Sequence, residues 1–208
     1  MQGHMKSALK NNIQDAVTPI RGSAATAILD IAERLAQTRG YNGFSYADVA
    51  AELGVTKASL HYHFRSKEVL GCALVARYSA AFGGALQTIA GSASDPREKL
   101  RQYVGLYEAV MRNDRMCLCG MLAAEIATLP DSMQAELRQF FDMNEQWLAD
   151  FLDAGRRSGA FSFSEAAIDR ARLMIGALEG AMLVARSFGD LERFAAAAGH
   201  LQQELTAK

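Results

Sequence analysis

Residues 44–64 read FSYADVAAELGVTKASLHYHF, and this stretch decides the fold of the 208-residue chain. Ser45 followed three residues later by Asp48 is typical of a capping box at the start of a helix. Gly54 can adopt a positive φ and end that helix. Thr56 then has the side chain needed to cap a second helix. The sequence therefore predicts two short helices joined by a glycine turn.

The second of these helices divides its residues between a buried and an open face. Leu60 and Phe64 belong to the buried face, and polar or aromatic side chains form the open one: Thr56, Lys57, Ser59, Tyr62 and His63. A recognition helix enters the major groove of DNA with its N-terminal end first. Lysine can donate to O6 and N7 of guanine, so Lys57 is the expected base contact. A packed three-helix unit without DNA affinity would explain the buried residues but not the open face.

Outward from this stretch, every further segment is predicted to be helical. Residues 23–39 place Ile28, Ile31, Ala32 and Leu35 at the spacing of an amphipathic helix. The chain has three prolines, which leave long stretches without a backbone break. Further helices are expected at residues 66–88, 96–112, 117–128, 131–157, 165–188 and 190–205. The fold class is therefore all-α, with a helix-turn-helix domain at 23–68 and a C-terminal helical domain at 69–208.

The quoted segment, with Lys67 and Leu70 after it, closely resembles the helix-turn-helix of TetR-family transcriptional regulators. The resemblance covers about residues 24–70. His61 stands where that family usually has tyrosine, and Ala58 where glycine is common. The resemblance implies contacts to base edges or phosphates from these residues: Ser45, Tyr46, Thr56, Lys57, Ala58, Ser59, His61, Tyr62, His63 and Lys67.

The resemblance also implies a homodimer that binds a palindromic double-stranded DNA operator as a repressor. In the family, the C-terminal domain binds a small-molecule effector, and the last two long helices form the dimer interface. Gly176 and Gly180 lie at i and i+4, where two helices can approach closely, and Ala181 and Leu183 extend the expected interface. An ordinary helix contact within one chain would use the same residues.

Aromatic and methionine side chains of the central helices are the candidates for an apolar ligand pocket. They are Tyr103, Tyr107, Met111, Cys117, Met121, Phe141, Trp147 and Met174. Glu108, Arg112 or Glu125 would orient a polar end of the ligand. Residues of these types at helical spacing also serve as ordinary core.

The cysteines suggest a second type of effector. Cys117 and Cys119 follow Arg112 and Arg115 near an expected helix start, where the helix dipole and the guanidinium groups would lower a thiol pKa. An electrophile or oxidant is then a candidate effector. The alternatives are a metal-responsive sensor that uses the same two cysteines and a plain packing role, which we also expect for Cys72. The spacing of histidines near the pair is a weak metal motif, so we expect neither a metal site nor a cofactor.

Composition excludes several other classes of protein. The net charge is −1, and residues 1–66 carry 7 Lys/Arg against 5 Asp/Glu, which permits a polyanionic partner. No run of 18 apolar residues or secretory segment is visible, so we expect a cytoplasmic protein without a membrane partner. Phosphate-loop, nucleophile-elbow and zinc-protease motifs are missing, which argues against an enzyme. An interaction module without DNA affinity is the remaining alternative.

The first residues of the chain are expected to contribute little to the fold. Residues 1–22 are interpreted as a flexible arm, and residues 1–4 as a cloning remnant ahead of Met5. Lys6, Lys10 and Arg21 in this arm are candidates for phosphate contacts.

Overall fold

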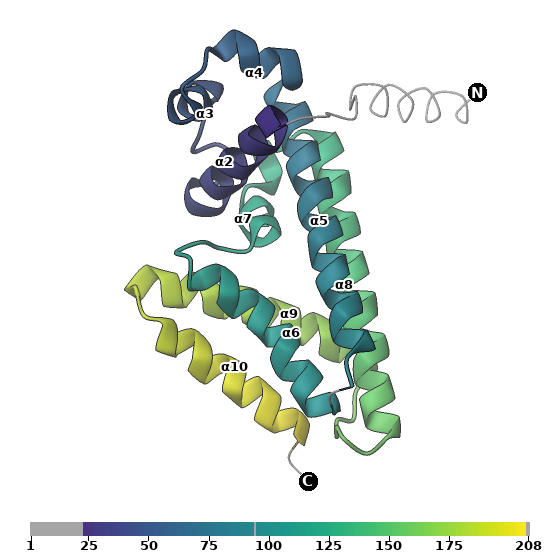
Figure 1. Cartoon of the computed structure of the whole chain (residues 1–208). Coiled ribbons are helices and arrows are strands. Elements are labelled where there is room, and N and C mark those ends of the chain that lie inside the picture. Colours follow the sequence, from purple (N-terminus) through teal and green to yellow (C-terminus); the bar gives the residue numbers. More distant parts are fainter. Residues whose placement is uncertain (1–22, 94, 207–208) are drawn as a thin grey trace, which may run out of the picture.

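The computed structural model describes residues 23–93 and 95–206, which form an all-α fold (Figure 1). Within the described residues the chain has no β-strand, and the expected fold class is confirmed. The predicted arm at residues 1–22 lies outside the described residues. The helices are α2 (Ser23–Arg39), α3 (Tyr46–Leu53), α4 (Lys57–His63), α5 (Lys67–Gly91), α6 (Pro96–Met111), α7 (Leu118–Ala124), the 3-10 helix η1 (Ile126–Thr128), α8 (Asp131–Arg157), α9 (Ala167–Phe188) and α10 (Leu191–Thr206).

Helix starts follow the capping residues in the sequence. Ser45 and Asp48 form the predicted capping box, since each side chain accepts a hydrogen bond from the backbone N–H of the other residue. Ser66 accepts from the N–H of Val69 at the start of α5. Asp95 caps α6 by accepting two backbone N–H groups. These local hydrogen bonds explain why the predicted helix bounds agree closely with the observed ones.

The segment predicted as one helix over residues 117–128 is the clearest difference. It is divided into α7 and η1 at Glu125, whose φ of −105° and ψ of 13° leave the α-helical region. The Glu125 side chain is drawn toward the loop between α2 and α3, as described below. A contact with a distant segment therefore interrupts this helix, and the local sequence carries no sign of it.

The elements are arranged around α5 and α8, which run side by side along the molecule (Figure 1). Helices α2, α3 and α4 gather at one end, while α6, α9 and α10 pack together toward the other. The short α7 contacts α2, α5 and α8. It lies between the two groups (Figure 1). Helix α5 is long and apolar enough to cross a membrane by length and composition alone. Its apolar side chains instead join the protein core, among them Leu74, Phe82 and Leu86.

Candidate functional site

Helices α3 and α4 meet at a tight turn that fixes the direction of α4. Gly54 has a φ of +71°, and the N–H of Val55 donates to the carbonyl of Ala50 at 3.0 Å. Leu60 and Phe64 are buried beneath α4. Because these contacts hold one face of α4, its other face is open to solvent: Thr56, Lys57, Ala58, His61 and Tyr62 are exposed there, and Ser59 and His63 are half-buried. Tyr62 is 86% exposed, far more than a packing role requires.

Several predicted DNA-binding residues surround one hollow on this surface. The hollow has a volume of about 360 Å³ and is lined by Phe44, Ser45, Tyr46, Ala47, Lys57, His61 and Lys67. The His61 ring lies 4.7 Å from the Tyr46 ring, centroid to centroid. The structure thus brings the start of α3 next to the start of α4, although ten residues or more separate them in the sequence.

Tyr46 and Lys67 have structural roles that differ from the expected DNA contacts. The Tyr46 hydroxyl is buried and donates to the Phe64 carbonyl at 2.7 Å. The Lys67 ammonium donates to the carbonyls of Tyr41 and Phe44 and lies 4.4 and 4.5 Å from the centres of their rings. Desolvation lowers the Lys67 pKa. Both polar groups are already occupied within the protein, which is the physical reason against their assignment as phosphate contacts.

The loop between α2 and α3 is held by a carboxylate from the other half of the chain. Glu125 accepts hydrogen bonds from the backbone N–H of Tyr41 at 2.5 Å and of Asn42 at 3.3 Å. The Asn42 amide also donates to the Thr128 hydroxyl at 2.7 Å. Gly40 has a φ of +81°, and a Cβ there would lie 2.7 Å from the Glu125 carboxylate. Glu125 is therefore a clamp on this loop, and its carboxylate oxygens are already engaged by backbone N–H groups, which argues against its expected role in orienting a ligand.

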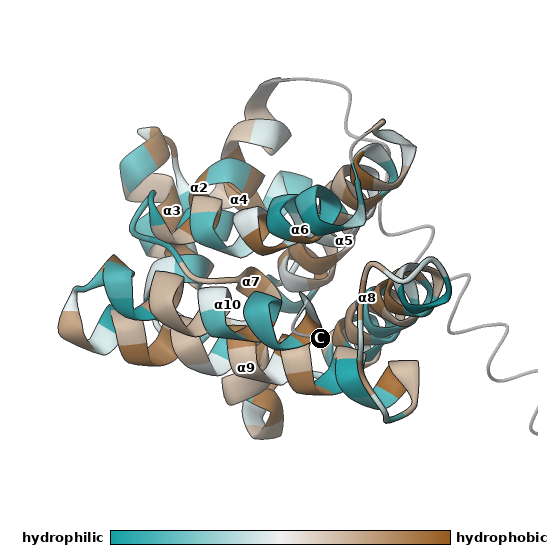
Figure 2. Cartoon of the chain, turned by 90° about the horizontal axis from the view of Figure 1, so that it is seen from below, coloured by the Kyte–Doolittle hydropathy of each residue, from teal (hydrophilic) through white to brown (hydrophobic). Residues whose placement is uncertain are grey.

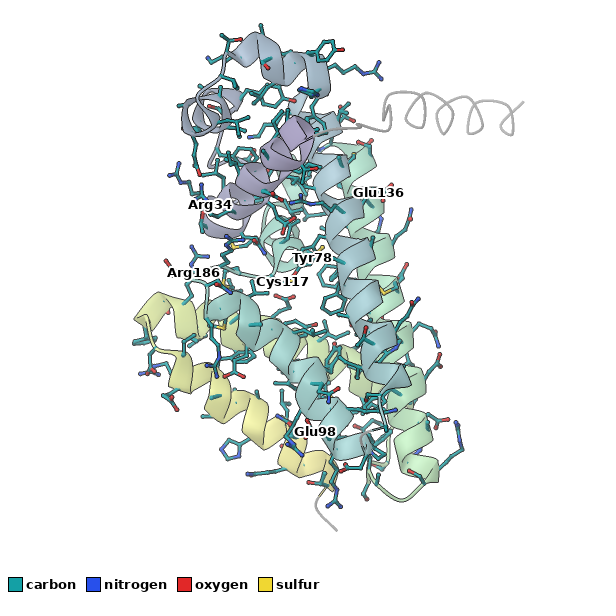
Figure 3. All side chains as sticks on the ribbon, viewed as in Figure 1. Arg34, Tyr78, Glu98, Cys117, Glu136 and Arg186 are labelled. Carbon is teal, nitrogen blue, oxygen red and sulfur yellow. The ribbon has the colours of Figure 1, made fainter. Side chains whose placement is uncertain are left out.

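A second contact fastens the C-terminal end of α2. Arg186 of α9 donates to the carbonyls of Gln37 at 3.0 Å and Thr38 at 2.5 Å (Figure 3). The N–H of Met116, just before α7, donates to the same Gln37 carbonyl. The last carbonyl groups of a helix have no hydrogen-bond donor within the helix. Here Arg186 and the N–H of Met116 supply the missing donors. The helix-turn-helix and the remaining helices are thus joined by specific hydrogen bonds.

Three of the predicted ligand residues meet in the interior. Tyr103 donates to the Asn144 side-chain oxygen at 3.0 Å, and the Asn144 amide donates to the Tyr107 hydroxyl at 3.0 Å. Trp147 stacks on Tyr103 with ring centres 5.7 Å apart. Sequence reasoning missed Asn144. Its position in the apolar stripe of α8, between Phe140 and Leu148, was the available signal, because a polar residue there must find a buried partner.

The other predicted ligand residues do not join this group. Met111 lines a separate surface pocket of about 280 Å³ near the α6–α7 connection, together with Met116 and Arg186. Met121 and Phe141 are half-buried on α7 and α8, and Met174 is fully buried on α9. Glu108 and Arg112 pair with each other at 2.7 Å, each more than a third exposed, and so face solvent.

Cys117 and Cys119 are both buried, and the expected lowering of their pKa is wrong. Desolvation raises the pKa of each thiol well above its usual value, and the negative charge of Glu179 raises it further. The Tyr78 hydroxyl lies 3.6 Å from the Cys117 sulfur, in the middle of the molecule (Figure 3). Across residues 23–93 and 95–206, no group of three or more His, Cys, Asp or Glu side chains is placed to hold a metal ion.

Helix α9 presents an apolar stripe to solvent. Leu173, Leu183, Val184 and Phe188 are each more than half exposed. They lie on one side of α9 together with the two predicted glycines, and Figure 2 shows hydrophobic residues recurring along this helix. A Cβ added at Gly176 or Gly180 would meet no atom within 4 Å. The alternative of a close helix contact within the chain is therefore wrong, because the described chain places nothing against these glycines.

A fixed helix-turn-helix with an open second helix, at one end of an all-α chain, defines the class of helix-turn-helix DNA-binding proteins. A family model described as "Bacterial regulatory proteins, tetR family" matches residues 28–72. A TetR-family transcriptional regulator from Agrobacterium tumefaciens is 35% identical with a TM-score of 0.84, over 88% of this chain and 97% of that one. A TetR regulator from Legionella pneumophila is 30% identical with a TM-score of 0.81, over 90% and 100%.

Among curated proteins, the HTH-type transcriptional repressor NemR of Escherichia coli is 26% identical over 79% of this chain and 86% of its own length. The chain belongs to the TetR family of bacterial regulatory proteins. It is a DNA-binding transcriptional regulator, and its relatives are regulators rather than enzymes.

Proposed function

We propose that the protein is a cytoplasmic repressor that binds a palindromic operator as a homodimer and is released by a small-molecule effector. The observation that carries this proposal is the open face of α4, which is fixed from below by Leu60 and Phe64 and exposes Lys57 and Tyr62 to solvent. The DNA-binding domain is residues 23–68, and residues 69–208 bind the effector and the second subunit.

The open face of α4 offers both kinds of contact that DNA recognition needs. Lys57 and Thr56 lie at the N-terminal end of the helix, which reaches base edges first. Most hydrogen bonds in protein–DNA complexes go to phosphate and sugar, so the other residues mainly position the helix. The proposed contacts are Ser45, Thr56, Lys57, Ala58, Ser59, His61, Tyr62 and His63.

The exposed stripe of α9 supports the dimer. Large apolar side chains such as Leu173 and Phe188 gain free energy when they leave water, at about 25 cal/mol for each Å² buried. Gly176 and Gly180 lie in the same stripe and permit a close approach by a second helix. A two-fold axis through this interface would place two copies of α4 on successive major grooves, roughly 34–36 Å apart.

The position of α7 supports release of DNA by an effector, because α7 lies between the helix-turn-helix and the C-terminal helices (Figure 1). Cys117, just before α7, is buried and Met121 of α7 packs against the core, while Glu125 at the end of α7 holds the loop before α3. A ligand that moves α7 therefore changes the position of the helix-turn-helix. We favour a reversibly bound ligand over an electrophile or oxidant, because the Cys117 and Cys119 thiols are buried and their pKa values are raised.

The proposal is tested by selecting DNA fragments from the source genome with the purified protein. We expect recovery of fragments that contain an inverted repeat, and an affinity that falls linearly with the logarithm of salt concentration. A scrambled duplex of equal composition is the control. Its affinity should be lower by a factor of about 10³ or more. Equal affinity for the selected and the scrambled duplex would contradict the proposal.

A further inference from the structure

Glu179 of α9 is a half-buried residue whose carboxyl group has no cation beside it in the described chain. Its Oε1 atom is inaccessible to solvent and has no hydrogen-bond partner. The Cys117 thiol lies within hydrogen-bonding reach of the same carboxyl group. Gly120 of α7 packs directly against it, so that a Cβ there would collide with Oε2. The absence of a side chain at Gly120 thus leaves space for this carboxyl group. Its polar side-chain neighbour there is the Cys117 thiol.

The charge of Glu179 is also unpaired. The ion pairs of the described chain connect other carboxylates to arginines, and none of them includes Glu179. Burial of an ionised carboxylate without a cation is costly, and desolvation accordingly raises the Glu179 pKa. Within the described chain, no cation and no hydrogen bond to Oε1 offsets that cost. A carboxyl group here is therefore explained more readily by binding than by folding.

Three tyrosines of the neighbouring helices are affected by the charge of Glu179. Tyr78 of α5 is half-buried, Tyr103 and Tyr107 of α6 are buried, and the negative charge of Glu179 raises the pKa of all three hydroxyls. Tyr78 is also connected to Glu179 indirectly. The Tyr78 hydroxyl lies 3.6 Å from the Cys117 sulfur, and Cys117 is in turn a neighbour of Glu179. The face of an aromatic ring attracts a cation, as does a carboxylate. Together these groups provide the chemistry that recognises a positively charged nitrogen attached to an apolar body.

We propose that Glu179 is the polar anchor of the effector site and that the effector is an organic cation, an amine or a quaternary ammonium compound with an apolar substituent. The proposal deepens the proposed function by naming the class of effector. Its ligand contacts are Glu179, Tyr78, Tyr103 and Tyr107, with Cys117 as a neutral neighbour.

The position of the site also suggests how its occupant would affect DNA binding. Gly120 lies against the carboxyl group, so we expect a ligand that binds Glu179 to displace α7 relative to α9. Five residues further along, Glu125 holds the N–H groups of Tyr41 and Asn42 before α3. Displacement of α7 therefore pulls on the loop that positions the helix-turn-helix.

Trp147 is the single tryptophan of the chain and stacks on Tyr103, so its fluorescence reports binding directly and without DNA. The probes are benzyltrimethylammonium and neopentylbenzene, which have the same shape but differ by the charge on one atom. For the wild-type protein we expect quenching by the cation at millimolar concentration and weaker binding of the neutral probe. Glu179→Gln should weaken the binding of the cation about tenfold or more, where tenfold corresponds to about 1.4 kcal/mol. The affinity for the neutral probe should not change. Glu108→Gln, which removes a surface carboxylate, is the matched control and should bind both probes as the wild type does.

Glu179→Asp keeps the negative charge and should still bind the cation more tightly than the neutral probe. This variant separates the loss of charge from a mere change in packing. Equal affinity of wild type and Glu179→Gln for the cation would overturn the proposal, as would equal affinity of the wild type for the two probes or no quenching by the cation. A separate titration of the DNA complex tests the proposed function. If the cation binds at Glu179 but leaves DNA bound, the site assignment stands and effector release fails.

Discussion

Lys67 holds its ammonium group between two backbone carbonyls and the faces of Tyr41 and Phe44. Lys67→Met keeps the aliphatic stem but leaves both carbonyls without this donor. We expect the free energy of unfolding to fall by about 1–2 kcal/mol, measured by urea denaturation. We expect the salt dependence of DNA binding not to change, because the Lys67 ammonium already donates to these two carbonyls.

Lys57→Met is the matched control, since Lys57 is exposed on α4. Its stability should stay within about 0.5 kcal/mol of the wild type, while its preference for the operator falls by about 1–3 kcal/mol. If Lys67→Met instead lowered the salt slope by about one unit and left stability unchanged, Lys67 would be a phosphate contact after all.

The two buried cysteines should react slowly in the folded protein. A raised pKa means that a smaller fraction of each thiol is ionised at any given pH, and the thiolate is the reactive form. Alkylation of Cys117 and Cys119 by iodoacetamide at neutral pH, followed by mass spectrometry, should therefore be far slower than in urea. The rate should still be rising with pH at pH 9, the ordinary thiol pKa, and should level off only above it. Rapid alkylation at neutral pH would revive the electrophile-sensing alternative.

At the level of elements, α7 is the connection between the effector region and DNA. Glu125→Ala removes the acceptor of the Tyr41 and Asn42 N–H groups. Loss of about 1.4 kcal/mol at these hydrogen bonds would speed hydrogen exchange at the two amides about tenfold. Exchange in α8 should stay as it is. Glu192→Ala, a change at an exposed residue of α10, is the control and should leave both amides unchanged. Unaltered exchange in Glu125→Ala would mean that the clamp does not hold the loop.

The same elements explain what the sequence could and could not predict. The helix starts at Ser45, Ser66 and Asp95 could be predicted from the sequence, because each capping side chain has its hydrogen-bond partner three residues away. Glu125 acts on residues more than 80 positions away, and Glu179 lies against α7 only after the chain has folded. Their roles depend on long-range packing, which periodicity and local spacing do not encode. For Lys67 the DNA-binding pattern was present, but the tertiary environment determined its contacts.

For the whole molecule, the central structural proposal is the dimer across α9. Gly180→Leu should overfill the close approach of two subunits and yield monomers, measured by sedimentation velocity. Gly84→Leu makes the same change on α5, where an added Cβ also meets no atom within 4 Å. Because an added Cβ meets no neighbouring atom at either position, we expect only the α9 variant to alter the oligomeric state. A Gly180→Leu protein that still sediments as a dimer would remove this face from consideration.

Footprinting on a selected genomic fragment tests the account most directly, because it examines α4, the dimer and the operator together. Hydroxyl-radical cleavage should reveal two protected half-sites related by an inverted repeat, with centres about 10 base pairs apart or a multiple of that. Both half-sites should lose protection together in Gly180→Leu. A single protected patch without symmetry, or protection that does not depend on sequence, would contradict the account of a dimeric repressor that reads DNA through α4.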